Sequence, residues 1–213
     1  MDTLLLAASN LGTEDYTGFT FFIGTMAMMA ATAFFLLERN SVEGKWRLSL
    51  TVSALITGIA CVHYYYMRDF WLIEFAAKGA NAESPTAFRY IDWILTVPLM
   101  CVEFYLLTKP FGAKGSTLFK LIVASIWMLV TGYIGEAAIL GGGSVLWGFI
   151  STIGYAYIVY EVFVGDIRKL SQSSNSPELK QAMFLLGIFI TLGWSIYPIG
   201  YMTMPDNWLA GMF

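Results

Sequence analysis

Six apolar runs of about twenty residues follow one another along the chain, separated by short polar stretches. About twenty helical residues span the hydrocarbon core of a bilayer, and lipid-exposed backbone must satisfy its own hydrogen bonds, which favours helices. The pattern therefore predicts an all-α membrane protein with one transmembrane domain over residues 1–213. We expect its helices at residues 17–38, 48–68, 86–108, 117–139, 144–165 and 181–204.

The run at 86–108 is unusual because it carries Arg89, Asp92 and Glu103. A charge at the centre of a membrane helix costs roughly 2.5–3.5 kcal/mol on insertion scales, so such residues usually serve a function. Asp92 and Glu103 are 11 residues apart, which is about 16 Å of rise and about 20° from alignment. Thr96 lies between them. The spacing suggests a column of protonatable groups, although each carboxyl could instead be a structural partner for a neighbouring helix.

Composition supports a membrane protein, since 57% of the residues are hydrophobic and only 13% are charged. A soluble domain would carry about a quarter charged residues. We find no basic face for nucleic acid, no metal-ligand cluster, no phosphate loop and no nucleophile–base set, so the residues do not support conventional enzymatic chemistry. Cys61 and Cys101 fall in apolar runs and are expected to be core residues, not a disulfide. The N-terminus has no positively charged region, so a cleaved signal peptide is not expected.

Positive charge predicts the orientation, because nine of the 12 Lys and Arg residues lie in or beside the first, third and fifth connections. These connections are expected to be cytoplasmic, with the N-terminus outside. Asp92 then lies towards the outer half and Glu103 towards the cytoplasmic half. Protons passing from Glu103 to Asp92 would move outward, through a central group that needs an energy input. Glu38 and Glu161, near cytoplasmic helix ends, are expected to be interfacial.

Four strings together resemble one family, the proteorhodopsin or xanthorhodopsin-type microbial rhodopsins. They are VHYYYMR, RYIDWILTVPLMCVEFY, GYIGEA and GWSIYPIGY, in the second, third, fourth and sixth runs. The resemblance implies a seven-helix retinal protein in the plasma membrane of a prokaryote, which pumps protons outward in the light. It also implies a homo-oligomer.

The resemblance assigns roles to the charged residues. Asp92 resembles the Schiff-base counterion and proton acceptor, and Arg89 the arginine that tunes it from the outer side. Glu103 resembles the cytoplasmic proton donor, and Asp, Thr and Glu at 92, 96 and 103 favour a proton pump over sodium or chloride pumps. His63 resembles the histidine that pairs with the counterion. On composition alone, His63 is better explained as a core histidine bonded to a backbone carbonyl.

An aromatic cage for the polyene is expected from Trp93, Trp194, Tyr197 and Tyr201, with Pro198 kinking the sixth helix. Trp194, Tyr197 and Tyr201 are spaced to share one helix face. Ordinary membrane packing also uses aromatic residues freely, so this assignment depends on the resemblance.

Two further positions gain meaning from the resemblance. Met100 occupies the colour-tuning position, where Leu or Met accompanies green absorption. Gly148 stands where many relatives have a bulky side chain, and in xanthorhodopsin-like members such a gap admits a hydroxylated carotenoid as a light-harvesting antenna. The alternative is that Gly148 permits close helix packing.

The chain departs from the family pattern at the retinal lysine, which the family carries in a seventh helix. We expect a Schiff base to a lysine outside the 213 residues, because none of the chain's own lysines is placed mid-membrane. A complementing chain, or a six-helix relative without pigment, would be alternatives. A sensory photoreceptor that signals to a transducer and a non-photochemical carrier are the rival functions. The lysines are Lys45, Lys78, Lys109, Lys114, Lys120, Lys169 and Lys180.

Overall fold

The computed structural model describes residues 15–203 and 209, and the described residues form helices and no strands. The chain separates into two compact units, Met1–Thr96 and Val97–Phe213. Helix α4 (Thr86–Thr108) is continuous and contributes its first half to the first unit and its second half to the second.

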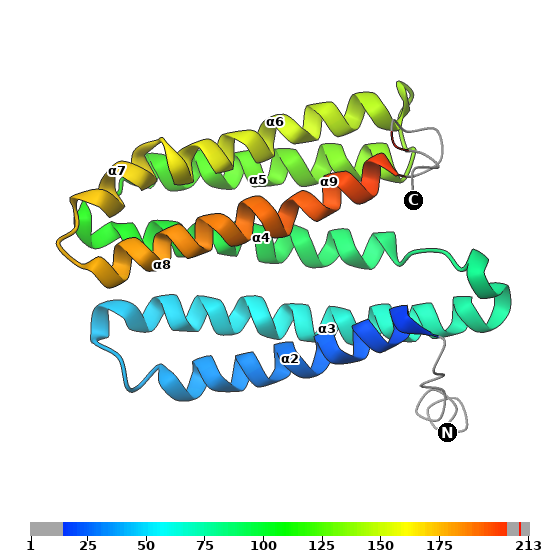
Figure 1. Ribbon diagram of the computed structural model, residues 1–213, viewed down its shortest axis with the longest axis horizontal. Coiled ribbons are helices and arrows are strands. Elements are labelled where there is room, and N and C mark those ends of the chain that lie inside the picture. The colour runs from blue at the N-terminus through cyan, green and yellow to red at the C-terminus, as the bar shows by residue number, and fades with distance from the viewer. Residues whose placement is uncertain (1–14, 204–208, 210–213) are drawn as a thin grey trace. The chain divides into compact units, whose positions relative to one another are not determined.

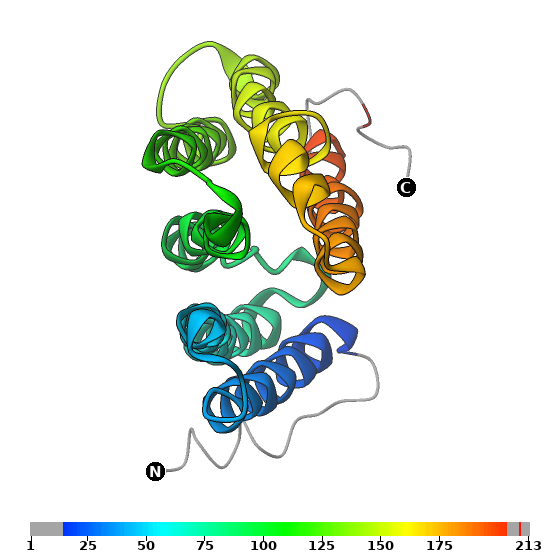
Figure 2. The ribbon, with the colours of Figure 1, turned by 90° about the vertical axis from the view of Figure 1, so that its left-hand side faces the viewer.

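Two long helices make up most of the first unit. Figures 1 and 2 show α2 and α3 side by side, running in opposite directions. The chain enters α2 at Asp15, whose Oδ1 accepts hydrogen bonds from Gly18 N and from Trp71 Nε1 of α3, both at 2.8 Å. The elements before α4 are α2 (Tyr16–Glu38), η1 (Gly44–Trp46), α3 (Arg47–Lys78) and η2 (Gly79–Asn81).

Small and hydroxyl-bearing residues let α2 and α3 approach closely. Thr32 Oγ1 lies 2.8 Å from Thr57 Oγ1 across the interface. The ring of Tyr64 from α3 occupies the space that a side chain at Gly24 would need. Interfaces of this kind are typical of membrane helices, which associate through van der Waals packing and hydrogen bonds because the hydrophobic effect does not act between them in lipid.

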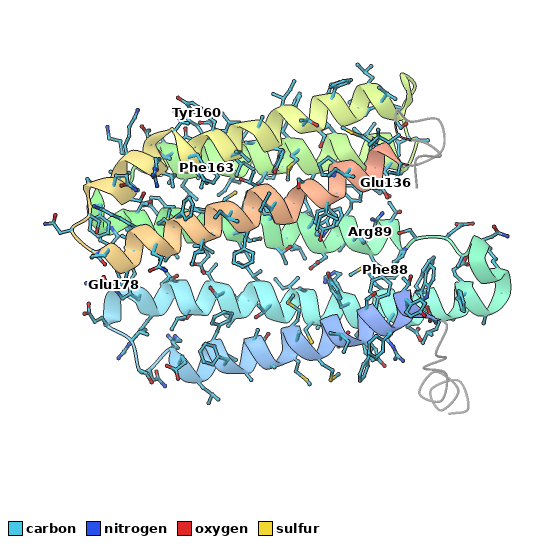
Figure 3. The ribbon with its side chains drawn as sticks, viewed as in Figure 1. Phe88, Arg89, Glu136, Tyr160, Phe163 and Glu178 are labelled. Atoms are coloured by element: carbon cyan, nitrogen blue, oxygen red, sulfur yellow. The ribbon has the colours of Figure 1, made fainter. Side chains whose placement is uncertain are left out.

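The second unit contains the remaining helices. Figure 2 shows α8 and α9 beside α6, and Figure 3 shows Glu136 and Glu178 at opposite ends of this unit. After α4 come η3 (Lys109–Phe111), α5 (Gly115–Glu136), α6 (Gly143–Phe163), α7 (Asp166–Ser173), α8 (Pro177–Ile188), the π-helical turn η4 (Phe189–Gly193) and α9 (Trp194–Met202).

Helices α5 and α6 are joined by side chains that bond to the backbone of the other helix. Ser151 Oγ donates to Met128 O at 2.6 Å, and Trp127 Nε1 donates to Ile150 O at 3.1 Å. A Cβ at Gly154 would lie 2.6 Å from a backbone oxygen of α5. The pair therefore packs with almost no space between its backbones, as in other small-residue membrane interfaces.

A buried apolar cluster fills the second unit. Helix α4 contributes two residues to it, and α5 to α8 and η4 contribute the rest. Its members are Cys101, Phe104, Leu121, Ala124, Ile158, Val162, Ile167, Leu179, Met183 and Ile190.

Six helical spans are long and apolar enough to cross a membrane, which confirms the predicted all-helical class and the number of spans. They are Tyr16–Glu38, Gly44–Lys78, Thr86–Phe111, Gly115–Glu136, Gly143–Ser173 and Pro177–Met202.

Two predicted connections were wrong because they contain helix. The second helix, expected to end at residue 68, continues to Lys78 and stops at Gly79, whose φ of +58° favours glycine. The charged residues after residue 66 lower the hydropathy, but the sequence has no Pro or Gly between residue 68 and Gly79 to end the helix earlier. The connection expected at 166–180 holds α7 and the first turn of α8.

Glu161 was expected to be interfacial; it lies two residues before the end of α6, and its side chain is buried within the protein. Its Oε1 accepts the Tyr157 hydroxyl at 2.8 Å, and its Oε2 accepts the backbone N–H of Asp166 at 2.9 Å. The carboxylate also occupies the space that a side chain at Gly165 would need. Glu161 therefore anchors the first residue of α7 to the end of α6.

We predict that Glu161→Gln destabilises this end of the second unit by about 1–3 kcal/mol, because an amide can accept only through its oxygen and one buried donor loses its partner. Trypsin cleavage after Arg168 and Lys169 should accelerate, and the thermal midpoint should fall. The control is Glu178→Gln, the same change at an exposed site. Equal behaviour of the two variants would contradict the anchoring role.

Candidate functional site: a buried carboxylate on α4

Stacked aromatic rings fix the start of α4 against α3 in the first unit. Phe88 (labelled in Figure 3) stacks on Tyr66 at 6.4 Å between ring centroids and contacts Phe70 at 6.2 Å. Asp92 lies one turn beyond Phe88 on α4, and His63 lies one turn before Tyr66 on α3. Residues three or four apart share a helix face. The aromatic contact thus sets a register that brings His63 to Asp92.

Asp92 and His63 lie next to each other in the first unit, although they are not hydrogen-bonded. His63 Nδ1 lies 3.7 Å from Asp92 Oδ1, too far for a hydrogen bond. The same nitrogen lies 2.9 Å from Ile59 O and donates to it when protonated. The backbone bond expected for a core histidine and the proximity expected for a counterion partner are therefore both present.

The Asp92 carboxylate is the distinctive feature of the site. Asp92 is 3% exposed, so it faces the protein interior and not lipid. Within the described residues, its Oδ1 is buried and has no hydrogen-bond partner. A buried carboxylate oxygen without a donor is costly, so this position suits a cation or an N–H donor supplied to the site.

Arg89 lies one turn before Asp92, in the first turns of α4 (Figure 3). Its Nη2 donates to Thr86 Oγ1 at 3.0 Å, and its guanidinium carbon lies 5.5 Å from the ring centroid of Trp93. Trp93 in turn makes an edge contact with Tyr90 at 5.1 Å. These contacts hold the guanidinium between Thr86 and the face of Trp93, in cation–π geometry.

Further along α4, Thr96 is 5% exposed, and its hydroxyl donates to the backbone oxygen of Asp92 at 2.9 Å, not to the carboxylate. Met100 and Glu103 are half-buried. The helix is unbroken from Thr86 to Thr108 although Pro98 lies inside it. Asp92 and Glu103 therefore keep the helical spacing on which the proposed column depends.

The expected aromatic residues of the sixth helix all lie in α9, in the second unit, with Pro198 inside the helix. Trp194 is half-buried and packs against the apolar cluster, and Tyr197 is 44% exposed. Tyr201 donates its hydroxyl to Ser144 O at 2.6 Å. The α-helical backbone from Trp194 onward preserves their predicted spacing.

The glycine expected to open a gap in the helix wall is covered by Tyr201. A Cβ at Gly148 would lie 2.9 Å from Cε1 of the Tyr201 ring, and the Tyr201 hydroxyl occupies the space beside Gly135 of α5. The two glycines form a notch that this ring fills. The geometry matches the close-packing alternative for Gly148.

The seven lysines lie in the short 3-10 turns or within two turns of a helix end. Lys120, the lysine furthest into α5, is exposed. In the described part of the chain, no group of three or more His, Cys, Asp or Glu is arranged to hold a metal ion.

Comparison with known proteins identifies the family. The family model for bacteriorhodopsin-like proteins matches residues 15–209. A green-light absorbing proteorhodopsin from Gamma-proteobacterium EBAC31A08 is 42% identical over 204 residues, which cover 95% of this chain and 78% of that protein.

Two solved structures are also similar. The crystal structure of blue light-absorbing proteorhodopsin from Med12 matches with a TM-score of 0.71 and 41% identity, covering 88% of this chain and 80% of that one. Xanthorhodopsin, described as a light-driven ion pump with dual chromophore, matches with a TM-score of 0.76 and 33% identity over 87% and 77% of the two chains. The similarity to both rhodopsin groups was predicted from the four strings. The protein belongs to the bacteriorhodopsin-like family.

Proposed function

We propose that this protein is a light-driven outward proton pump, with Asp92 as the proton acceptor. The observation that carries the proposal is a buried Asp92 oxygen on a membrane-spanning helix, which lies next to His63 and has no hydrogen-bond donor in the described part of the chain. The relatives support it, because the family model covers most of the chain and one structural neighbour is described as a light-driven ion pump.

The residues fit retinal as the chromophore. Asp92 offers a buried negative partner for a protonated Schiff base, and Trp93, Trp194, Tyr197 and Tyr201 offer rings for the polyene. Bound retinal supplies a base whose proton affinity is switched by light. Because the chain's lysines lie near helix ends, we propose that the linking lysine belongs to a seventh helix outside the 213 residues. Met100 presents an apolar, polarisable side chain, which favours green absorption.

The residues of α4 divide the proton transfer between two ends of one helix. Asp92 receives a proton in the outer half, and Glu103 supplies one from the cytoplasmic half, about 16 Å away along the axis. Thr96 fixes the backbone at Asp92, and Arg89 adds a positive charge on the outer side. The direction of transport follows from the proposed orientation, with the N-terminus outside. We further propose that the protein resides in a prokaryotic plasma membrane as a homo-oligomer.

Transport is tested by illuminating cells that express the protein with retinal supplied. We expect acidification of the medium that a protonophore abolishes. Asp92→Asn should abolish it because the neutral amide cannot accept a proton. Glu103→Gln should slow proton uptake about a hundredfold, as expected for loss of a positioned proton donor.

Asp69→Asn is the matched control, since Asp69 is exposed on α3 and its change should leave pumping intact. A coloured pigment that never acidifies the medium and cycles slowly would favour the sensory photoreceptor. A protein that transports protons equally in darkness would favour the non-photochemical carrier.

We propose that His63 is coupled to the charge of Asp92, because the His63 Nδ1 lies 3.7 Å from the Asp92 Oδ1. His63→Ala should move the midpoint of the pH-dependent colour change by about one pH unit. The measurement is an absorption titration of the purified pigment. Tyr65→Phe, a change at a half-exposed residue of the same helix, should leave the midpoint unchanged. An identical titration in the native protein and His63→Ala would refute the coupling.

We further propose that a hydroxylated carotenoid binds beside Gly148 as an antenna. Its binding requires the Tyr201 ring to leave the notch. Tyr201→Phe removes the hydrogen bond to Ser144 O and should raise carotenoid affinity about fivefold. Gly148→Trp should abolish binding by filling the notch. The measurement is a carotenoid band in the retinal excitation spectrum. Absence of this band from both the native protein and Tyr201→Phe would refute the proposal.

A further inference from the structure

The sixth spanning helix is interrupted by a π-helical turn, η4, between α8 and α9. A π-turn disturbs the regular hydrogen-bond ladder and is frequently found at functional sites. Backbone carbonyls left without partners are especially costly in a membrane, where water is not available to replace the lost bond.

Hydroxyl groups donate hydrogen bonds to carbonyls in and beside this turn. Thr191 Oγ1 donates to Gly187 O at 2.9 Å, and Ser195 Oγ donates to Leu192 O at 2.7 Å. These two bonds are local to the helix. The third comes from another helix: the Tyr155 hydroxyl of α6 donates to Thr191 O at 2.7 Å.

Tyr155 also lies 3.4 Å from Ile190 O, so its hydroxyl spans two successive carbonyls of the turn. Its ring packs against the buried cluster of the second unit, which includes Ile190. The phenol is therefore held by packing at one end and by the turn at the other. This arrangement ties the π-turn to α6.

Trp194 follows the turn directly as the first residue of α9. Four residues later, Pro198 has no N–H to offer the Trp194 carbonyl. The backbone around Trp194 thus has a π-turn on one side and a missing hydrogen bond on the other. Its placement depends strongly on what holds the turn in position.

We propose that Tyr155 is a positioning residue, whose hydroxyl bond to Thr191 O sets the place of the Trp194 indole against the chromophore. The role in the pigment rests on the proposed function, whereas the bond itself does not. The substitution Tyr155→Phe removes the hydroxyl and keeps the ring. Tyr160→Phe is the matched control, because Tyr160 is 50% exposed on the same helix.

Both variants are compared with the native protein in lipid nanodiscs with retinal added. Amide hydrogen exchange over residues 187–195 should be about fivefold faster in Tyr155→Phe, the effect expected from losing one hydrogen bond. The absorption maximum should also shift, since the indole moves relative to the polyene. Tyr160→Phe should match the native protein in both measurements.

Unchanged exchange in Tyr155→Phe would overturn the bond as a support of the turn. Faster exchange with an unchanged absorption maximum would overturn the positioning of Trp194. If the native protein forms no pigment, the proposed function fails, whereas hydrogen exchange still decides whether Tyr155 holds the turn.

Discussion

The apolar environment of a membrane span imposes one constraint on this protein: each polar group within it needs a partner from the protein itself. The helix contacts show how this is met. Ser151 and Trp127 bond to carbonyls of the facing helix, and Thr32 and Thr57 bond to each other. Against this background the buried Asp92 oxygen stands out, because it has no donor among the described residues. A buried carboxylate oxygen without a donor destabilises the folded protein, so a functional role is the best explanation for Asp92.

The same constraint explains why the irregular part of the sixth helix is rich in hydroxyls. A π-turn and a proline within one span both disturb the regular backbone hydrogen-bond ladder. Thr191, Ser195 and Tyr155 donate hydroxyl hydrogen bonds to carbonyls in and beside the turn. Three polar side chains thus accompany the irregular backbone of the sixth spanning helix. Such support lets the backbone depart from α-helical geometry next to Trp194 without exposing polar atoms to lipid.

Sequence reasoning succeeded where hydropathy and charge act locally. The bounds of α4 were predicted to the residue, since its apolar run begins after Pro85 and ends before Lys109. The approach of His63 to Asp92 was predicted from the family resemblance alone, because no periodicity links residues 29 positions apart. The burial of Glu161 was not predicted, since it depends on how the chain passes from α6 into α7 and presents the N–H of Asp166. The π-turn was missed because FITLG has the composition of any apolar helix.

Gly148 illustrates how a single residue can support opposite conclusions until its neighbours are known. In the sequence, the missing side chain at Gly148 is compatible either with an opening for a ligand or with close packing of a neighbouring helix. The structure supplies the neighbour, Tyr201, whose ring lies against both Gly148 and Gly135 while its hydroxyl bonds to Ser144 O. A ring that is packed on two helices and hydrogen-bonded to one is a structural element of the second unit. Any ligand that uses this notch must therefore compete with a residue of the chain, so its affinity depends on the strength of the Tyr201 contacts as much as on the missing side chain.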